Sequence, residues 1–158
     1  MKVYFDTSTL VKLYYPEPQS VEVASWLSQK KQPVLLSALQ ELELKNALCL
    51  KVFWGHLEKD ECQKIIQSID DDIDNGALIK LALNWNELFS STFELSAHYS
   101  QKHGLRSLDI LHVASALQVS ATHFLTFDER QAKLAKKAGL KIVKMIHSLN
   151  QATVDKLK

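Results

Sequence analysis

The chain has 158 residues, 46% of them hydrophobic, and a formal net charge of +1. A chain of this length buries about 70% of the surface that its unfolded form exposes, so one hydrophobic core and a single domain over residues 1–158 are expected. The small net charge excludes a protein that is basic all over. No apolar run approaches the ~18 residues of a membrane span, and the N-terminus does not resemble a secretory leader, so we expect a cytosolic (cytoplasmic) protein with no membrane partner.

Apolar runs of strand length alternate along the chain with longer helical patterns, which is typical of βαβ units. Strands are predicted near residues 2–6, 33–37, 77–82, 122–126 and 141–144. Helices are predicted near residues 8–15, 19–30, 39–55, 58–73, 86–103, 107–120 and 129–138. The predicted fold class is α/β, a three-layer α/β/α sandwich with a five-stranded parallel sheet. Two consecutive helices over residues 39–73 interrupt the alternation and could project as a dimer or partner surface.

Charge is spread unevenly along this order of elements. Acids dominate between Glu58 and Glu94, whereas nearly every charge from Arg130 onward is basic. Two interpretations stay open for the basic segment: a surface that faces phosphates, or a solvated helix face whose cations suit the helix C-terminus. The lysines concerned are Lys133, Lys136, Lys137, Lys141, Lys144, Lys156 and Lys158.

Cysteines and tryptophans suggest packing more than chemistry. Cys49 and Cys62 lack the spacing of metal ligands and fall inside predicted helices, so we expect thiols of the core. Trp26, Trp54 and Trp85 have apolar neighbours at helical spacing, which favours core packing over stacking on nucleic-acid bases.

Four acids occupy positions in the predicted elements that are unusual for surface acids. Asp6 and Asp128 directly follow predicted strands, whose carboxyl ends form the ligand-binding edge of an open parallel sheet. Glu43 and Asp109 lie on the apolar sides of predicted helices, where an unpaired charge is unfavourable. Acids gathered at one edge would repel one another unless a cation lay among them, and hard oxygen ligands suit Mg²⁺ or Mn²⁺. The sequence therefore predicts a metal site.

Each acid also has a purely structural interpretation. Asp128 precedes a helical pattern and has Gln131 three residues later, as in a capping box. Asp109 follows a plausible N-cap, Ser107, and could favour the positive end of its helix dipole. Asp6 could simply end a strand whose next residues, Thr7 and Ser8, cap the following helix. The four positions together favour a common role.

The same segments, in the same order, resemble a PIN-domain nuclease, with the greatest likeness to VapC-type toxins of type II toxin–antitoxin systems. The resemblance covers nearly the whole chain. It rests on Phe5-Asp6-Thr7-Ser8, on Ser37 with Glu43-Leu-Lys-Asn-Ala-Leu48, on Leu105-Arg-Ser-Leu-Asp109-Ile-Leu-His-Val-Ala-Ser-Ala-Leu117, and on Leu125-Thr-Phe-Asp128 followed by Ala138-Gly139-Leu140.

The resemblance implies a Mg²⁺- or Mn²⁺-dependent endoribonuclease that forms homodimers and is neutralised by a cognate antitoxin protein. It maps the acidic site onto Asp6, Glu43, Asp109 and Asp128. It also places Thr126 beside these acids, together with Thr7 or Ser8, as hydroxyl neighbours.

Roles can be assigned from the chemistry that hydrolysis of a phosphodiester requires. Asp6 and Asp109 are predicted direct metal ligands, Glu43 a ligand or a base acting through water, and Asp128 an outer ligand. Arg106 is either a phosphate contact or a member of a surface ion pair. His112, one helical turn from Asp109, could bind the metal or hydrogen-bond a carboxylate, and a packed histidine or a partner of a ligand carboxylate is the favoured interpretation.

Two other classes of protein compete with this prediction. A phosphatase that uses Asp6 as a covalent nucleophile would want a second acid two residues later, where Ser8 stands. A catalytically inert PIN-like module that binds RNA or protein would not require the complete set of acids.

Overall fold

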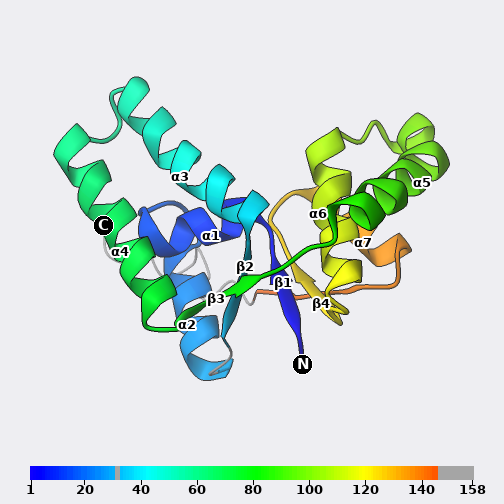
Figure 1. The fold of residues 1–158 in the computed structure, drawn as a ribbon, viewed down its shortest axis with the longest axis horizontal. Helices are drawn as coiled ribbons and strands as arrows, with labels where there is room; N and C mark the ends of the chain where they lie inside the picture. Colours follow the sequence, from blue (N-terminus) through cyan, green and yellow to red (C-terminus); the bar gives the residue numbers. More distant parts are fainter. Residues whose placement is uncertain (31–32, 146–158) are drawn as a thin grey trace, which may run out of the picture.

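The computed structural model describes residues 1–30 and 33–145, so the predictions for Lys156 and Lys158 lie outside the described residues. Strands and helices alternate along these residues much as predicted (Figure 1). The strands are β1 (Val3–Phe5), β2 (Val34–Ser37), β3 (Leu78–Leu81), β4 (His123–Leu125) and β5 (Lys141–Ile142). The helices are α1 (Thr7–Tyr14), α2 (Ser20–Lys30), α3 (Ala38–Phe53), α4 (Lys59–Asp74), α5 (Trp85–His103), α6 (Ser107–Gln118) and α7 (Glu129–Lys137).

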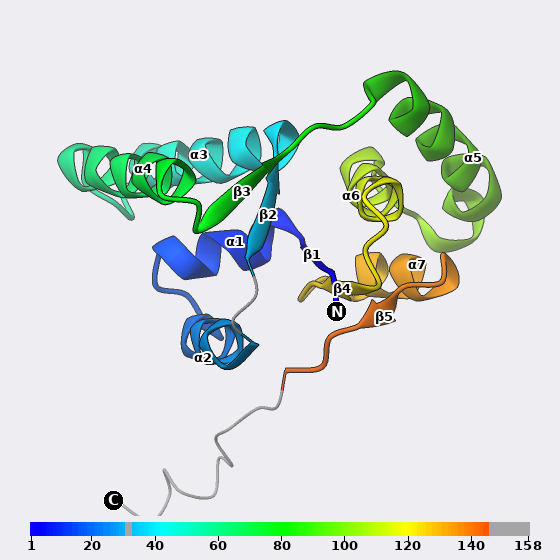
Figure 2. The ribbon, with the colours of Figure 1, turned by 60° about the horizontal axis from the view of Figure 1, so that its bottom comes forward.

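Helices cover both sides of the strands, which confirms the α/β class. In Figures 1 and 2, α1 to α4 gather on one side and α5 to α7 on the other. Strand β1 contributes to both halves because its side chains alternate between the two faces. Val3 and Phe5 pack in a cluster with residues of α1, α3 and α4, whereas Tyr4 packs in a second cluster with residues of α6 and α7.

The sheet differs from the prediction of one continuous five-stranded sheet. Among the described residues the strands form two hydrogen-bonded ladders, one with the order β1-β4-β5 and one that pairs β2 with β3. Every pairing in them is parallel, as predicted. All five predicted strands are present, and β2 lies beside β1, but no ladder joins those two strands.

A buried glutamine, Gln40, connects the ends of β1 and β2, the two neighbouring strands that no ladder joins among the described residues. The side-chain amide of Gln40, in the first turn of α3, donates a hydrogen bond to the backbone carbonyl of Phe5 at 2.6 Å. Its side-chain oxygen accepts from the backbone N–H and the hydroxyl of Ser37, both at 2.8 Å. Gln40 thereby satisfies polar groups at the ends of β1 and β2 that strand pairing would otherwise have to satisfy.

Two expectations about core packing are wrong. Cys62 is buried as expected, but Cys49 is exposed. Trp26 packs against Phe5, whereas the side chains of Trp54 and Trp85 are exposed. Helical spacing showed that these residues have apolar neighbours on the same side of their helix, but it could not show whether another element covers that side.

Helices α3 and α4 extend away from the strands as an antiparallel pair (Figure 1), as the sequence suggested. Phe53 and Trp54, at the far end of α3, are 82% and 57% exposed. Within residues 1–30 and 33–145, no helix has the length and apolar character needed to cross a membrane.

Replacing Gln40 tests its part in joining β1 to α3. Gln40→Ala leaves the Phe5 carbonyl and the Ser37 N–H without these partners, and an unpaired buried polar group costs about 1–3 kcal/mol. We expect urea unfolding to show a loss of about 2 kcal/mol or more in the free energy of unfolding. Gln67→Ala, in which an exposed glutamine that donates to Asp71 is removed, is the control and should change stability by less than ~0.5 kcal/mol. Equal effects of the two substitutions would contradict this role of Gln40.

Candidate active site

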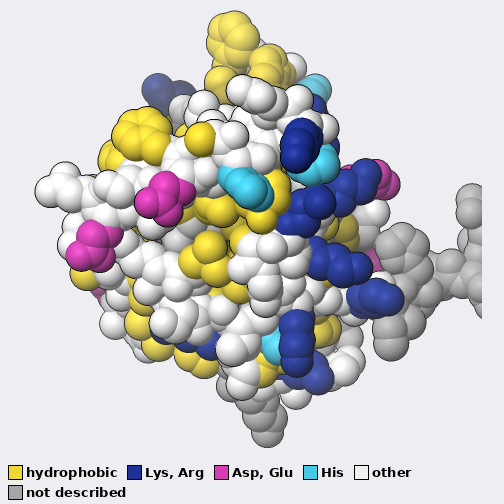
Figure 3. All heavy atoms as spheres, turned by 90° about the vertical axis from the view of Figure 1, so that its right-hand side faces the viewer, with side chains coloured by type: hydrophobic (Ala, Val, Ile, Leu, Met, Phe, Trp, Pro, Cys, Tyr) yellow, Lys and Arg dark blue, Asp and Glu magenta, His cyan; other side chains and the backbone are white. Residues whose placement is uncertain are grey.

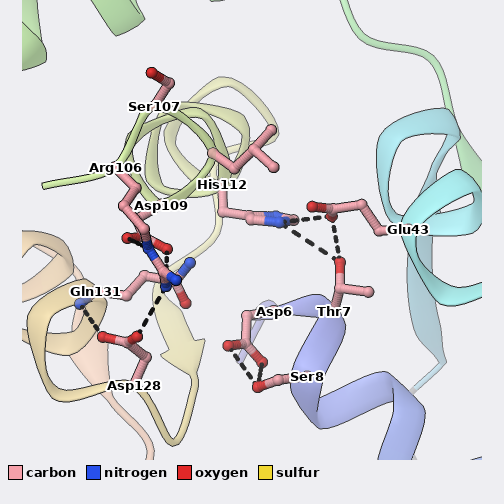
Figure 4. A pocket seen from close by; sticks show the side chains of 11 residues that line it. Asp6, Thr7, Ser8, Glu43, Arg106, Ser107, Asp109, His112, Asp128 and Gln131 are labelled. Carbon is pink, nitrogen blue, oxygen red and sulfur yellow. Dashed lines mark hydrogen bonds and ion pairs between the residues drawn. The ribbon is translucent and has the colours of Figure 1, made fainter. Parts of the chain in front are cut away.

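The four predicted acids line one pocket of about 380 Å³, although they come from four separate segments (Figure 4). Asp6 follows β1, Asp128 lies three residues after β4, and Glu43 and Asp109 project from α3 and α6. The parallel register aligns Phe5 with Leu125, so the ends of β1 and β4 lie side by side. The remaining lining residues are Thr7, Ser8, Arg106, Ser107, Leu108, His112 and Gln131.

Asp6 is buried and is surrounded by neutral hydrogen-bond donors. The hydroxyl of Thr126 donates to its Oδ2 at 2.7 Å, and the hydroxyl of Ser8 lies within 3.0 Å of both oxygens. The backbone N–H of Thr9 donates to Oδ1 at 2.8 Å, which makes Asp6 itself the N-cap of α1. This corrects the alternative in which Thr7 and Ser8 cap that helix. Among the described residues, no cationic side chain is bonded to Asp6.

Glu43 forms a second group with Thr7 and His112. The Thr7 hydroxyl donates to its Oε2 at 2.6 Å, and Nε2 of His112 lies 2.8 Å from the same oxygen. Burial by itself would raise the pKa of Glu43, but the hydrogen bond and charge of His112, with the bond from Thr7, outweigh it and hold that pKa below its usual value. Glu43 is therefore kept as a carboxylate that can accept a proton or bind a cation.

His112 is a partner of that carboxylate, which agrees with its main interpretation from the sequence. Because a carboxylate only accepts hydrogen bonds, Nε2 donates to Glu43, and Nδ1 faces the Tyr4 hydroxyl at 3.0 Å. Tyr4 is fully buried, and burial raises the pKa of its phenol. Tyr4 could not be identified from the sequence, because it lies in an ordinary apolar strand.

Asp109 and Asp128 form a third group through Arg106. The guanidinium donates to both oxygens of Asp109, at 2.9 Å and 3.1 Å, and to Oδ2 of Asp128 at 3.2 Å. Asp109 is 6% exposed, so this contact compensates an otherwise buried charge. Arg106 precedes α6 as its N-cap residue without a side-chain cap bond, so the expected N-cap at Ser107 is wrong by one position.

Asp128 also caps α7, as its structural interpretation proposed. Its Oδ1 accepts from the backbone N–H groups of Arg130 and Gln131 at 2.8 Å and 3.0 Å. Its own backbone N–H donates to the Thr126 hydroxyl, which links it to Asp6. Among the described residues, the Gln131 side chain does not accept from the backbone N–H of Asp128, so the second bond of a capping box is absent.

Gln131 is a member of the site that the sequence suggested only as a helix-capping residue. Its side chain lines the pocket and is 3% exposed, yet its Oε1 finds no hydrogen-bond partner within the described part of the chain. A buried amide oxygen without a partner calls for a water or an ion. The only signal in the sequence was its place three residues after Asp128.

The donor set fits a hard divalent cation, since four carboxylates and an unpaired amide oxygen face the same pocket. In the arrangement of residues 1–30 and 33–145, however, no three acidic, histidine or cysteine side chains come close enough together to hold one. The acids are instead held in the three groups described above, with Arg106 between two of them (Figure 4). The roles of the four acids as ligands stay predictions.

Basic side chains gather on one part of the molecule, as the uneven charge of the sequence suggested. Figure 3, which looks onto the side that carries α5 and α7, shows lysines and arginines grouped along one side of this face. The exposed residues of the last elements include Lys133, Lys136, Lys137, Lys141 and Lys144. None of them forms an ion pair with another described residue.

Known proteins resemble this chain in sequence and in fold. Residues 3–137 match the PIN domain family. The chain belongs to that family. Curated relatives from Mycobacterium tuberculosis include Ribonuclease VapC47 (strain CDC 1551 / Oshkosh), 26% identical over 142 residues that cover 87% of this chain and 92% of the relative. Ribonuclease VapC46 (strain ATCC 25618 / H37Rv) is 26% identical over 143 residues, covering 89% and 95%.

Solved structures show the same fold at lower identity. FitAcB from Neisseria gonorrhoeae superimposes with a TM-score of 0.65 at 19% identity, covering 92% of this chain and 99% of that one. A toxin–antitoxin complex from Klebsiella pneumoniae gives a TM-score of 0.56 at 15% identity, with coverage of 92% and 98%. The PIN domain thus resembles VapC ribonucleases in sequence and chains of such complexes in fold.

Proposed function

We propose that this PIN domain is a metal-dependent endoribonuclease and the toxin of a toxin–antitoxin pair. The observation that carries the proposal is the convergence of four carboxylates, from four separate segments, on one pocket at the carboxyl ends of β1 and β4. The curated relatives that it resembles over most of its length are named ribonucleases. We treat residues 1–158 as one catalytic domain.

Mg²⁺ or Mn²⁺ would be held by Asp6, Asp109 and Glu43, with Asp128 as an outer ligand. The chemistry of the donor set supports this choice, because carboxylate oxygens suit both ions. When bound, such an ion lowers the pKa of water and stabilises negative charge on the attacked phosphate and the leaving oxygen.

The protein's own residues then hold the acids in place and handle the proton. Ser8 and Thr126 fix the carboxylate of Asp6 by donating to it, so the charge needs little rearrangement during the reaction. Thr7 and His112 do the same for Glu43, which keeps a carboxylate at the pocket for accepting a proton through water. Arg106 lines the pocket and can contact a phosphate of the substrate.

RNA is the proposed substrate because of the named relatives and the distribution of charge. Unpaired lysines on α7 and β5 give a surface that attracts a phosphate backbone over several ångströms. Large apolar side chains are exposed at the end of α3 and on α5, among them Phe53, Trp54 and Phe93. Such patches are typical of protein interfaces, and we assign them to an antitoxin and to a second copy of the chain.

Neutralising Asp6 tests catalysis separately from folding. Asp6→Asn keeps an oxygen that can cap α1 but removes the charge that would hold the ion, so we expect RNA cleavage to fall by more than about a hundredfold. Its far-UV circular dichroism should match that of wild type. Asp60→Asn, at an exposed position in the first turn of α4, is the matched control and should cleave RNA normally. An inert RNA- or protein-binding module would show no cleavage in the wild type either.

Asp128 allows capping and catalysis to be separated at one position. Asparagine is a good N-cap, so Asp128→Asn should keep the melting temperature, whereas Asp128→Ala should lose about 1 kcal/mol of stability. If Asp128 serves only α7, Asp128→Asn cleaves RNA like wild type. We expect it to lose most of its cleavage rate over a series of Mg²⁺ concentrations, because the cap needs an oxygen acceptor and the ion needs the negative charge.

A further inference from the structure

Arg106 donates to three of the four carboxylate oxygens of Asp109 and Asp128. Both oxygens of Asp109 accept from its guanidinium, as does Oδ2 of Asp128. The remaining oxygen, Oδ1 of Asp128, accepts from two backbone N–H groups of α7. No carboxylate oxygen on this side of the pocket is free of a donor.

The other side of the pocket is held differently. Within the part of the chain that the structure describes, Asp6 accepts only from hydroxyl groups and a backbone N–H, and Glu43 accepts from the Thr7 hydroxyl and from His112. These partners do not bring the fixed positive charge of a guanidinium to the oxygens. The pocket is therefore divided into a side whose acids are held by hydroxyl groups, a backbone N–H and a histidine, and a side whose acids are paired with an arginine.

We infer that Arg106 is a built-in counter-ion that competes with the divalent ion for Asp109 and Asp128 and is displaced when the ion binds. This inference deepens the proposed function and rests on it. A guanidinium and a divalent ion repel each other, so they cannot share the same carboxylate oxygens at the distances of direct contact. The bidentate, charge-assisted contact to Asp109 makes Arg106 a specific competitor for those oxygens.

The position of Arg106 makes displacement feasible. Its side chain is 62% exposed, and it contacts the two acids from the open edge of the pocket. It has an extended backbone conformation ahead of α6, so the side chain can swing into solvent without disturbing the helix. The released guanidinium then lies at the mouth of the pocket, where a substrate phosphate can replace the two carboxylates as its partner.

The competition predicts that removing the arginine strengthens metal binding, which is opposite to the effect of removing a ligand. Solvent screens the exposed guanidinium of Arg106, so the gain from releasing Asp109 and Asp128 is modest, and the Kd for Mn²⁺ should fall by about fivefold. Isothermal titration calorimetry of chelator-treated Arg106→Gln against Mn²⁺ alone measures this change. Arg106→Lys, which cannot form the bidentate contact, should have an intermediate Kd.

Arg130→Gln is the matched control. Arg130 is an exposed arginine at the start of α7, and its side chain makes no hydrogen bond or ion pair to the part of the chain that the structure describes. Its removal changes the net charge equally and should leave the Kd unchanged. If Arg130→Gln lowered the Kd as much as Arg106→Gln, general charge would account for the effect and the inference would be wrong.

Thermal unfolding gives a second readout that does not depend on activity. In chelator, Arg106→Gln should melt below wild type because its carboxylates lack their counter-ion, and saturating Mn²⁺ should raise its melting temperature by more than it raises that of wild type. If the wild type binds Mn²⁺ and Arg106→Gln has an equal or higher Kd, the inference is wrong and the proposed function still stands. A wild type that binds no Mn²⁺ would overturn both.

Discussion

Negative charge confined at one edge of the strands is the constraint on which this site depends. Two aspartates that are less than a tenth exposed, Asp6 and Asp109, share a pocket with Glu43 and Asp128. Buried carboxylates that lack partners are strongly unfavourable, and like charges close together raise the cost further. The surrounding structure supplies three different kinds of compensation: hydroxyl and backbone donors, a histidine, and an arginine.

The fold contributes to this compensation through its helices. Asp6 and Asp128 are both N-cap residues, so each lies at the positive end of a helix dipole and satisfies backbone N–H groups of α1 or α7. The same two residues follow neighbouring parallel strands, which brings the helix ends to one edge. An aspartate at each position can therefore serve both roles, since capping needs an oxygen acceptor and the proposed metal binding needs the negative charge.

Much of this could be predicted from the sequence because it depends on local patterns. Short apolar runs between longer amphipathic segments identified every strand and helix, and acids at strand ends identified the edge where Asp6 and Asp128 meet. The joint pattern of four segments, around Asp6, Glu43, Asp109 and Asp128, resembled the PIN family, and the match of residues 3–137 to that family confirms it.

The features that the sequence did not reveal depend on contacts between distant segments. Gln40 sits in the first turn of α3 like any helix residue, yet its amide reaches Phe5 and takes the place of strand pairing. The exposure of Trp54 depends on how far α3 and α4 extend beyond the strands, which periodicity does not measure. Arg106 had two open interpretations, and only the distances to Asp109 and Asp128 show which partners it has.

The central claim is that the four acids act by holding a divalent ion that is needed to cleave RNA. The most direct test is to follow cleavage of end-labelled RNA by chelator-stripped wild-type protein while Mn²⁺ is titrated back, with binding measured by calorimetry on the same sample. The account predicts no cleavage in chelator and recovery that follows the binding curve. Cleavage at full rate in chelator, or recovery unrelated to the occupancy of the site, would contradict it.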